Sequence, residues 1–264
     1  MLQENDLYNS ASFRFYGSLN DFLPKKLRQR TILYHFKGKP SIKDAIEAIG
    51  IPHPEVQIIL KDQEPSDFSS SLVNNSLISV FPFFSSLDIQ SLQLANRNPY
   101  KHLRFILDVH LGKLAKLLRF AGFDSLIYPG LEDSEIADLG SREERILLTR
   151  DIGLLKHRKV QFGYWIRSQD PIEQFKEVAL HFRISESDLK PWKRCSICNG
   201  EIMYVEKKQI SDKLEPQSNK YYSEFFQCEN CGHIYWKGSH YEKIQLWLNK
   251  TMSFISTEHK RKSK

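Results

Sequence analysis

The four cysteines of this chain constrain its fold more than any other feature. They form two Cys-x-x-Cys pairs, Cys195 with Cys198 and Cys228 with Cys231, and 29 residues lie between the pairs. Two residues between the cysteines of a pair let both thiolates reach one tetrahedral ion. Because all 4 cysteines of the chain belong to these pairs, we predict a closed structural Zn²⁺ site, a zinc ribbon, rather than disulfides. Redox-active dithiols are the alternative.

The residues that follow each pair suit the turns of a zinc ribbon. Asn199-Gly200 follows the first pair and Gly232 follows the second, and these residues tolerate the left-handed backbone of such turns. The polar residues 206–220 between the pairs are expected to form a long hairpin arm. We place the whole ribbon at residues 191–248.

Aromatic residues flank the second pair on both sides, at 225–226 and 234–236. We expect them to pack the ribbon against a helix over residues 240–248, and stacking on nucleic-acid bases is the alternative. The last residues, 249–264, are polar and rich in lysine. They are expected to form a frayed basic tail.

Residues 103–190 alternate between strand and helix patterns. Strands are expected over 103–108, 124–128, 146–149 and 164–167, and helices over 111–121, 133–144 and 171–183. This alternation predicts an α/β domain in which helices cover the faces of a parallel sheet.

The first 86 residues predict a separate, small α+β domain. Strand patterns cover residues 12–16, 56–60 and 77–83. Between them, Ser41 fits the N-cap of a helix with Asp44 three residues later, and Gly50 fits the end of that helix. Residues 87–102, which are rich in serine, asparagine and glutamine, are expected to form a linker.

Charge is distributed unevenly along the chain, whose formal net charge is +6. Residues 1–90 hold 9 Lys/Arg and 10 Asp/Glu, whereas residues 91–264 hold 29 and 22. The second part could therefore attract a polyanion such as nucleic acid. Four of its cations lie in the last five residues, and without them its excess falls to +3. Charge alone therefore favours nucleic acid only slightly.

The sequence contains no segment that predicts membrane insertion. The apolar run over residues 77–87 is short and is interrupted by proline and serine. The first ten residues are polar and include acids, unlike a secretory leader. We therefore expect a cytoplasmic protein that does not associate with membranes.

Three aspartates stand where a parallel α/β fold collects ligands. Asp108 ends the first strand of the α/β domain, Asp151 follows the third strand, and Asp133 begins the second helix. Because ligands bind outside the carboxyl ends of such strands, we expect the three carboxylates to meet and to bind Mg²⁺ or Mn²⁺. This metal could activate water against a phosphodiester. The alternatives are helix caps at Asp108 and Asp133 and turn chemistry at Asp151.

The helix expected over residues 111–121 has two faces. Its apolar residues, spaced three and four apart, face the core. Lys113, Lys116 and Arg119 are expected on the other face, beside the aspartates, where a phosphate backbone would lie. An ordinary solvated face is the alternative.

Long, ordered motifs make residues 103–245 similar to a known family. The motifs are DVHLGKLA over 108–115, RILLTRD over 145–151, RCSICNG over 194–200 and YWKGSHY over 235–241. On these motifs the chain resembles the Mut-seven C-terminal RNase domain, in which a PIN-like nuclease fold is fused to a zinc ribbon.

The resemblance implies a metal-dependent ribonuclease with RNA as its substrate. It implies that Asp108, Asp133 and Asp151 correspond to the acidic cluster of PIN nucleases. Many PIN nucleases have a fourth acid, for which Glu135 and Asp170 are candidates.

The basic residues of the motifs complete the expected RNA site. Arg150 precedes the third aspartate and joins Lys113, Lys116 and Arg119 as an expected RNA-binding residue. Lys116 stands where arginine is expected in the family, and lysine keeps the charge but loses the planar fork.

Residues 12–84 resemble a β-grasp domain of the ubiquitin and sulfur-carrier type. The resemblance rests on the segment from Asp44 to Val56 and on the closing Val80-Phe81-Pro82. A sulfur carrier needs a free Gly-Gly end, whereas this domain runs on through Phe83-Phe84. Carrier chemistry is therefore excluded, and a role in binding a protein partner or in scaffolding remains.

Three hypotheses follow for the function. The first is a metal-dependent ribonuclease, the second is a non-catalytic RNA-binding module, and the third is a protein-interaction adaptor led by the β-grasp domain. Dependence on a divalent metal separates the first from the others, because only the nuclease needs Mg²⁺ or Mn²⁺.

Overall fold

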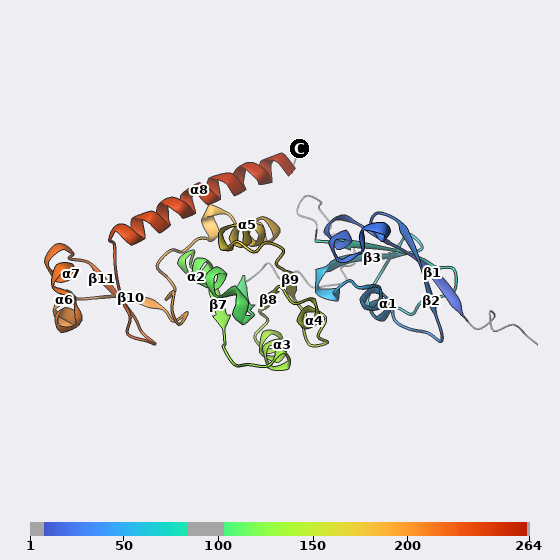
Figure 1. Ribbon diagram of the computed structural model, residues 1–264, viewed down its shortest axis with the longest axis horizontal. Helices are drawn as coiled ribbons and strands as arrows, with labels where there is room; N and C mark the ends of the chain where they lie inside the picture. Colours follow the sequence, from blue (N-terminus) through green and yellow to red (C-terminus); the bar gives the residue numbers. More distant parts are fainter. Residues whose placement is uncertain (1–7, 84–102, 263–264) are drawn as a thin grey trace, which may run out of the picture. The chain divides into compact units, whose positions relative to one another are not determined.

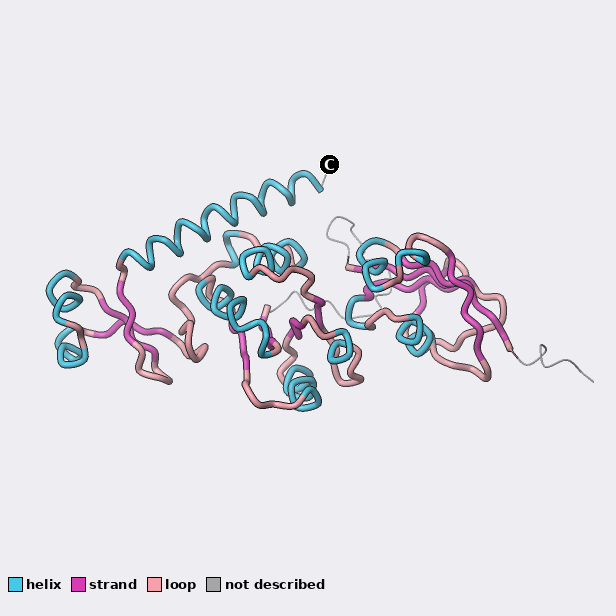
Figure 2. Tube along the Cα trace, viewed as in Figure 1, coloured by secondary structure: helices cyan, strands magenta, loops and turns pink. Residues whose placement is uncertain are grey.

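The structure, a computed structural model, describes residues 8–83 and 103–262, and its strands form three sheets (Figure 1, Figure 2). The linker expected over 87–102 lies outside the described residues. The chain forms two compact units, each built from two separate segments. The first unit combines residues 1–101 with 132–165, and the second combines residues 102–131 with 166–264.

The N-terminal sheet is mixed, as expected for a β-grasp domain. Its strands are β1 (Asn9–Phe15), β2 (Thr31–Phe36), β3 (Val56–Lys61), β4 (Glu64–Ser66) and β5 (Leu77–Pro82). Their order is β2-β1-β5-β3-β4, in which β1 is antiparallel to β2 and parallel to β5. The strand patterns in the sequence identified β1, β3 and β5 but missed β2 and β4.

Helix α1 (Ile42–Ile49) belongs to the same domain and begins and ends where the sequence predicts. The backbone N–H of Asp44 donates to Oγ of Ser41 at 3.1 Å, and the N–H of Ser41 donates to Oδ2 of Asp44 at 3.2 Å, which completes a capping box. Gly50 ends the helix with φ 126°. Ile42 and Ile46 are fully buried in the core of the domain.

The central α/β domain has a second sheet with the strand order β7-β6-β8-β9. Its strands are β6 (Arg104–Leu107), β7 (Asp124–Ile127), β8 (Ile146–Thr149) and β9 (Gly163–Trp165). Its helices are α2 (Gly112–Phe120), α3 (Asp133–Arg142), α4 (Ile152–Leu155) and α5 (Pro171–His181). β6 pairs with β7 in parallel, and β8 pairs with β9 in parallel, so the expected α/β class is confirmed.

The cysteine-rich part contains a three-stranded antiparallel sheet. Its strands are β10 (Ile202–Val205), β11 (Phe225–Cys228) and β12 (Ile234–Trp236). The expectation of a long hairpin arm over 206–220 is wrong, because two short helices, α6 (Lys207–Ile210) and α7 (Pro216–Tyr221), fill this segment. The ammonium of Lys207 ties them together by donating to the carbonyl oxygens of Asn219 and Tyr222.

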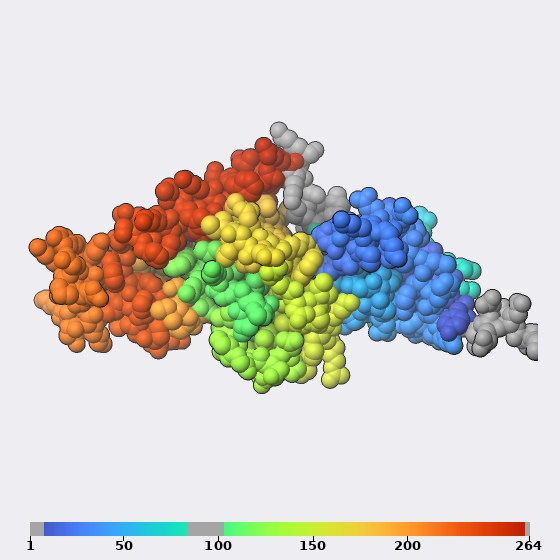
Figure 3. Space-filling model, viewed as in Figure 1, coloured from blue at the N-terminus to red at the C-terminus, as the bar shows by residue number. Residues whose placement is uncertain are grey.

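The last helix, α8 (Ser239–Lys262), is longer than expected. The prediction of a frayed tail from residue 249 onward is wrong, because Thr251, Met252 and Ile255 are buried and continue the helix. The rings of Trp247 on α8 and Phe175 on α5 lie 5.1 Å apart, and the space-filling view shows α8 along α5 (Figure 3). Although α8 has 24 residues, neither it nor any other helix within residues 8–83 and 103–262 is both long enough and apolar enough to cross a bilayer.

The β-grasp domain packs on residues 132–165 within the first compact unit. The ammonium of Lys156 donates to the carbonyl oxygen of Glu47 at 3.0 Å, and the backbone N–H of Trp165 donates to Oε1 of Glu55 at 2.6 Å. The rings of Phe22 and Trp165 lie 5.0 Å apart. The β-grasp domain therefore supports the segment that follows β8.

Candidate functional site

The four cysteine side chains meet at one point of the second unit. Their sulfur atoms all lie within 4.8 Å of one another. Sγ of Cys195 is 3.6 Å from Sγ of Cys231, and Sγ of Cys198 is 3.4 Å from Sγ of Cys228. A tetrahedral zinc ion with bonds of about 2.3 Å holds its sulfurs about 3.8 Å apart. The cluster therefore fits one Zn²⁺ with four protein ligands and no open position.

Local backbone geometry prepares the first cysteine pair for this role. Asn199 has φ 69°, the left-handed conformation expected from the sequence. The N–H groups of Cys198 and Gly200 lie 3.5 Å from Sγ of Cys195 and Sγ of Cys198, respectively, where they stabilise thiolates. A Cβ on Gly200 would stand 2.9 Å from Sγ of Cys228, so a larger residue would push into the cluster.

Arg119 joins the α/β domain to the cysteine cluster, and the expectation that it lies on an exposed basic face is wrong. Its side chain is buried, and only 4 % of the residue is exposed. Nε donates to the carbonyl oxygen of Ser125 at 2.8 Å, and Nη1 donates to the carbonyl oxygen of Ile197 at 2.9 Å, between the first two cysteines. Burial lowers the pKa of this guanidinium, and the nearby cysteine thiolates oppose that shift. A zinc ion held by four thiolates would have net negative charge, which this cation would offset.

Asn199 makes a second connection between the ribbon and the α/β domain. Its amide oxygen accepts the backbone N–H of Ser125 at 2.8 Å, and its amide nitrogen donates to Oδ1 of Asp124 at 2.7 Å. The side chain thereby binds the start of β7. The sequence drew attention to Asn199 only for its backbone, so this contact was not foreseen.

Asp108 and Asp151 each follow a strand, as expected, and each caps the turn that comes next. Oδ1 of Asp108 accepts the N–H of His110 at 2.9 Å, and the residue is only 7 % exposed. Oδ1 of Asp151 accepts the N–H groups of Gly153 at 2.6 Å and Leu154 at 3.2 Å, at the start of α4. The local alternatives weighed from the sequence are therefore present at both positions, and each uses one carboxylate oxygen.

Asp133 is exposed and is the first residue of α3. The alternative that it caps this helix is wrong, because the N-cap is Glu132 and the backbone N–H of Glu132 donates to Oε2 of Glu135 at 2.9 Å. Within residues 8–83 and 103–262, the carboxylate of Asp133 accepts no hydrogen bond. Asp108 belongs to the second compact unit and Asp133 and Asp151 to the first, so their assembly into one metal site remains a prediction.

The two candidates for a fourth acid both have local structural roles. Glu135 completes the capping box of α3. Oδ1 of Asp170 accepts the N–H groups of Ile172 at 2.9 Å and Glu173 at 3.0 Å and so caps α5. Neither role prevents the other carboxylate oxygen of the residue from binding a metal ion.

A basic cleft of about 570 Å³ opens beside the start of α2 in the second unit. Lys113 and Lys116, both exposed, line it together with His110 and the buried Arg119, and no acidic side chain lines it among the described residues. Arg150, the remaining residue expected to bind RNA, is exposed and belongs to the first unit. All three helix residues therefore line the same cleft, although Arg119 is buried and donates to backbone carbonyl groups.

The parallel α/β sheet and the four-cysteine ribbon define an α/β protein with a cysteine cluster that could hold a structural metal ion. The family model of the Mut7-C RNAse domain matches residues 103–248, more than half of the chain, and that of the Mut7-C ubiquitin domain matches residues 8–88. The chain therefore belongs to the Mut7-C RNAse domain family and carries the ubiquitin-like domain fused before it.

Comparison with individual proteins adds little to the family match. No curated protein matches the sequence. Among solved structures, the solution structure of the Haloferax volcanii HVO 2177 protein is similar, with 13% identity and a TM-score of 0.25 over 32% of this chain and 92% of that chain.

Proposed function

We propose that this chain is a metal-dependent ribonuclease that hydrolyses RNA phosphodiester bonds. The observation that carries the proposal is membership of the Mut7-C RNAse domain family over the α/β domain and the ribbon. The α/β domain contains Asp108, Asp133 and Asp151, which the sequence predicts to be the catalytic acids.

Under this proposal the three aspartates hold one Mg²⁺ or Mn²⁺, and Zn²⁺ in the four cysteines is structural. Hard cations prefer carboxylate oxygens and keep part of their water shell. The donor chemistry fits, because Asp133 makes no helix cap and Asp151 uses only Oδ1 for its cap among the described residues. A bound divalent ion would supply an activated water and would stabilise the charge that develops on the phosphate.

The basic cleft is the proposed path of the RNA backbone. Lys113 and Lys116 would contact phosphates, which position a strand without reading its sequence. They follow Asp108 by five and eight residues, so phosphates bound to them would lie close to that carboxylate. Arg150, next to Asp151 in the sequence, is a further proposed phosphate contact.

A cleavage assay tests the proposal directly. A mixed pool of single-stranded and structured RNA is incubated with the full chain, with Mg²⁺, with Mn²⁺ and with no added divalent metal. Cleavage is expected only when one of the two metals is present. Binding without cleavage under all three conditions would favour the non-catalytic RNA-binding module. A protein partner of the β-grasp domain and a cytoplasmic location remain predictions.

A further inference from the structure

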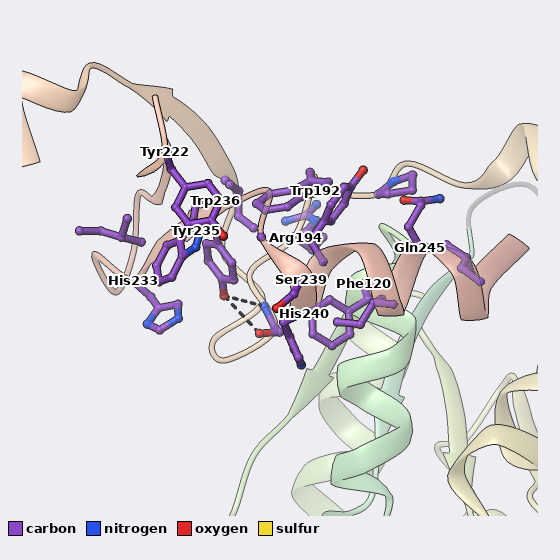
Figure 4. Close-up of a pocket in the computed structure, with 18 of the residues that line it drawn as sticks. Phe120, Trp192, Arg194, Tyr222, His233, Tyr235, Trp236, Ser239, His240 and Gln245 are labelled. Atoms are coloured by element: carbon purple, nitrogen blue, oxygen red, sulfur yellow. Dashed lines mark hydrogen bonds between the residues drawn. The ribbon is translucent and has the colours of Figure 1, made fainter. Parts of the chain in front are cut away.

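An aromatic cavity of about 470 Å³ lies where the ribbon meets the first turn of α8 (Figure 4). The ribbon contributes Tyr235 and Trp236 from β12, and α8 contributes Ser239, His240 and Tyr241 from its first turn. Phe120, the last residue of α2, closes another side. All of these residues belong to the second compact unit.

The wall of this cavity presents several ring systems that are not fully buried. Trp192 lines the cavity, and its ring centroid lies 4.9 Å from that of Tyr241 and 5.9 Å from that of Tyr235. The ring of Trp236 lies 6.1 Å from that of Tyr222. The aromatic residues thus pack the ribbon near α8, as the sequence predicts, yet they also leave open surface. Exposed aromatic faces are the surfaces on which nucleic-acid bases stack.

Trp192 adopts a backbone conformation that is rare for its residue type. Its φ is 72°, in the left-handed region that bulky side chains seldom occupy. Residues in such strained backbone conformations cluster at binding sites, where the surrounding structure holds the side chain in a fixed position. In this conformation Trp192 lines the cavity.

The polar groups of the cavity suit an anionic, heterocyclic ligand. Among the described residues, no aspartate or glutamate lines the cavity, whereas Arg194, His233 and His240 do. Nε of Arg194 is buried and has no hydrogen-bond partner among them, although its Nη1 donates to the carbonyl oxygen of Asn199 at 3.3 Å. Nη2 of Arg194 lies 3.7 Å from Oε1 of Glu201, which does not line the cavity, so a ligand phosphate would compete with this ion pair for the guanidinium.

The cavity also lies next to the basic cleft along the chain. Phe120 of the cavity follows Arg119, which lines the cleft, and Ser196 of the cavity precedes Ile197 of the cleft. Lys116 stands four residues before Phe120 on α2, which is about 6 Å along the helix. A strand held by phosphate contacts in the cleft could therefore continue into the cavity.

We propose that this cavity binds unpaired bases of a single-stranded RNA whose backbone occupies the basic cleft. The proposal rests on the proposed function for its ligand class. Stacking is tolerant of sequence because every base has a π face, so the cavity would favour single-stranded over paired RNA without selecting one base. It would position the strand and would take no part in the chemical step.

Binding to two probes of equal charge tests the proposal. One is a ten-residue single-stranded oligoribonucleotide, and the other is a ten-residue ribose-phosphate chain without bases. Both carry a fluorescent label, and anisotropy is measured with the zinc-loaded full chain and no added Mg²⁺ or Mn²⁺. Trp236→Leu and Tyr241→Leu keep an apolar side chain at each position but remove the stacking face. Each is expected to weaken binding of the oligonucleotide about tenfold and to leave binding of the base-free chain unchanged.

The matched control is Tyr204→Leu, because Tyr204 is an exposed aromatic residue of the same ribbon outside the cavity. It is expected to bind both probes as the wild type does. Equal losses for both probes, or no loss for the oligonucleotide, would overturn the base site. A variant with reduced zinc content has failed to fold and cannot test the site. In that case a fluorescence measurement on the wild type provides the test. Its tryptophan fluorescence should be quenched by the oligonucleotide and not by the base-free chain, and equal responses would overturn the site.

The outcomes separate this inference from the proposed function. A wild type that shows the difference between probes but never cleaves RNA with Mg²⁺ or Mn²⁺ would contradict the nuclease and leave the base site standing. A wild type that cleaves RNA but makes no distinction between the probes would contradict the base site alone.

Discussion

Nε2 of His53 lies 2.7 Å from the carbonyl oxygen of Val160, although 107 residues separate the two in the sequence. On the other side of the ring, Nδ1 lies 2.5 Å from Oε1 of Glu47. The histidine is only 5 % exposed. One buried side chain therefore connects helix α1 of the β-grasp domain with the segment that leads into β9.

Replacement of His53 by alanine should loosen this connection. The carbonyl oxygen of Val160 and the carboxylate of Glu47 would lose a buried partner, so the free energy of unfolding should fall by about 1–3 kcal/mol. Urea denaturation measures the change. His35→Ala, at an exposed histidine of β2 in the same domain, is the control and should change little. Equal stability of the two variants would show that the contact contributes nothing.

Replacement of Asp108 or Asp151 by asparagine should abolish metal-dependent cleavage. Asparagine keeps the shape and still caps a helix, but it removes the charge that holds a divalent cation. We expect cleavage to fall by about 100-fold or more, beyond the usual cost of losing an outer-shell partner. Asp44→Asn, in the capping box of α1, provides a matched control for the cap and should cleave as the wild type does. Wild-type turnover in both variants would place the site elsewhere.

The double variant Lys113→Ala/Lys116→Ala should weaken RNA binding by a similar factor for every RNA sequence. Each phosphate contact that is removed reduces the number of counterions released when the RNA binds. The slope of log affinity against log salt concentration should therefore become shallower by about 1.4 for two contacts on single strands. Thermal stability should hardly change, because both side chains are exposed. Lys25→Ala/Lys26→Ala, an exposed pair in the β-grasp domain, is the control. Parallel salt slopes for the two variants would make Lys113 and Lys116 an ordinary solvated face.

Arg119→Ala should behave differently from the lysine variants, because its primary effect is on stability. Three backbone carbonyl groups, those of Ser125, Ser196 and Ile197, would lose a charged donor, so the free energy of unfolding should fall by about 2 kcal/mol or more. Arg119→Lys should recover only part of the loss, since lysine lacks the planar fork. Lys116→Ala on the same helix is the control for charge. A variant with full stability and weakened RNA binding would restore the original assignment of Arg119 to the RNA surface.

Removal of zinc should disorder the ribbon and also disturb its neighbours in the α/β domain. Binding of zinc to four cysteines contributes directly to folding of such a module. Because Arg119 and Asn199 bond the first cysteine turn to α2 and β7, hydrogen exchange should rise over residues 119–126 as well as over 192–236 when a strong chelator is added. Residues 8–83 should keep their protection. Unchanged exchange in the ribbon after complete loss of zinc would contradict this account.

The sequence predicted the class of each part of the fold because the relevant signals are local. The cysteine spacing, the capping box of α1 and the alternation of strands with helices each depend on residues close together in the chain. The same holds for Asp108 and Asp151, whose positions after strands are visible without a structure. The sequence could not predict hydrogen bonds between residues that lie far apart in the chain, such as the one between His53 and Val160.

Some errors had a visible signal that was given too little weight. Arg119 lies four residues after Ala115 and one after Leu118, both fully buried, so helical spacing already places it near the core face. Similarly, Leu248, Met252 and Ile255 recur at helical spacing, but the surrounding polar residues hid the continuation of α8.

Other errors had no usable signal. Strand β4 has three residues, and α4 has four, which is below the length at which periodicity can be recognised. The carbonyl groups that anchor Arg119 and the φ of Trp192 depend on tertiary packing, which propensity does not encode.

The interleaved segments of the two compact units affect how the chain can fold as it leaves the ribosome. Synthesis proceeds from the N-terminus, and domains usually fold in the order in which they emerge. Here residues 8–83 emerge first, but the surface that receives Val160 and Trp165 stays uncovered until residue 165 has been made. The second unit starts with residues 102–131 and cannot finish before α8 appears. A nascent chain stalled between residues 131 and 165 would therefore hold two unfinished units at once.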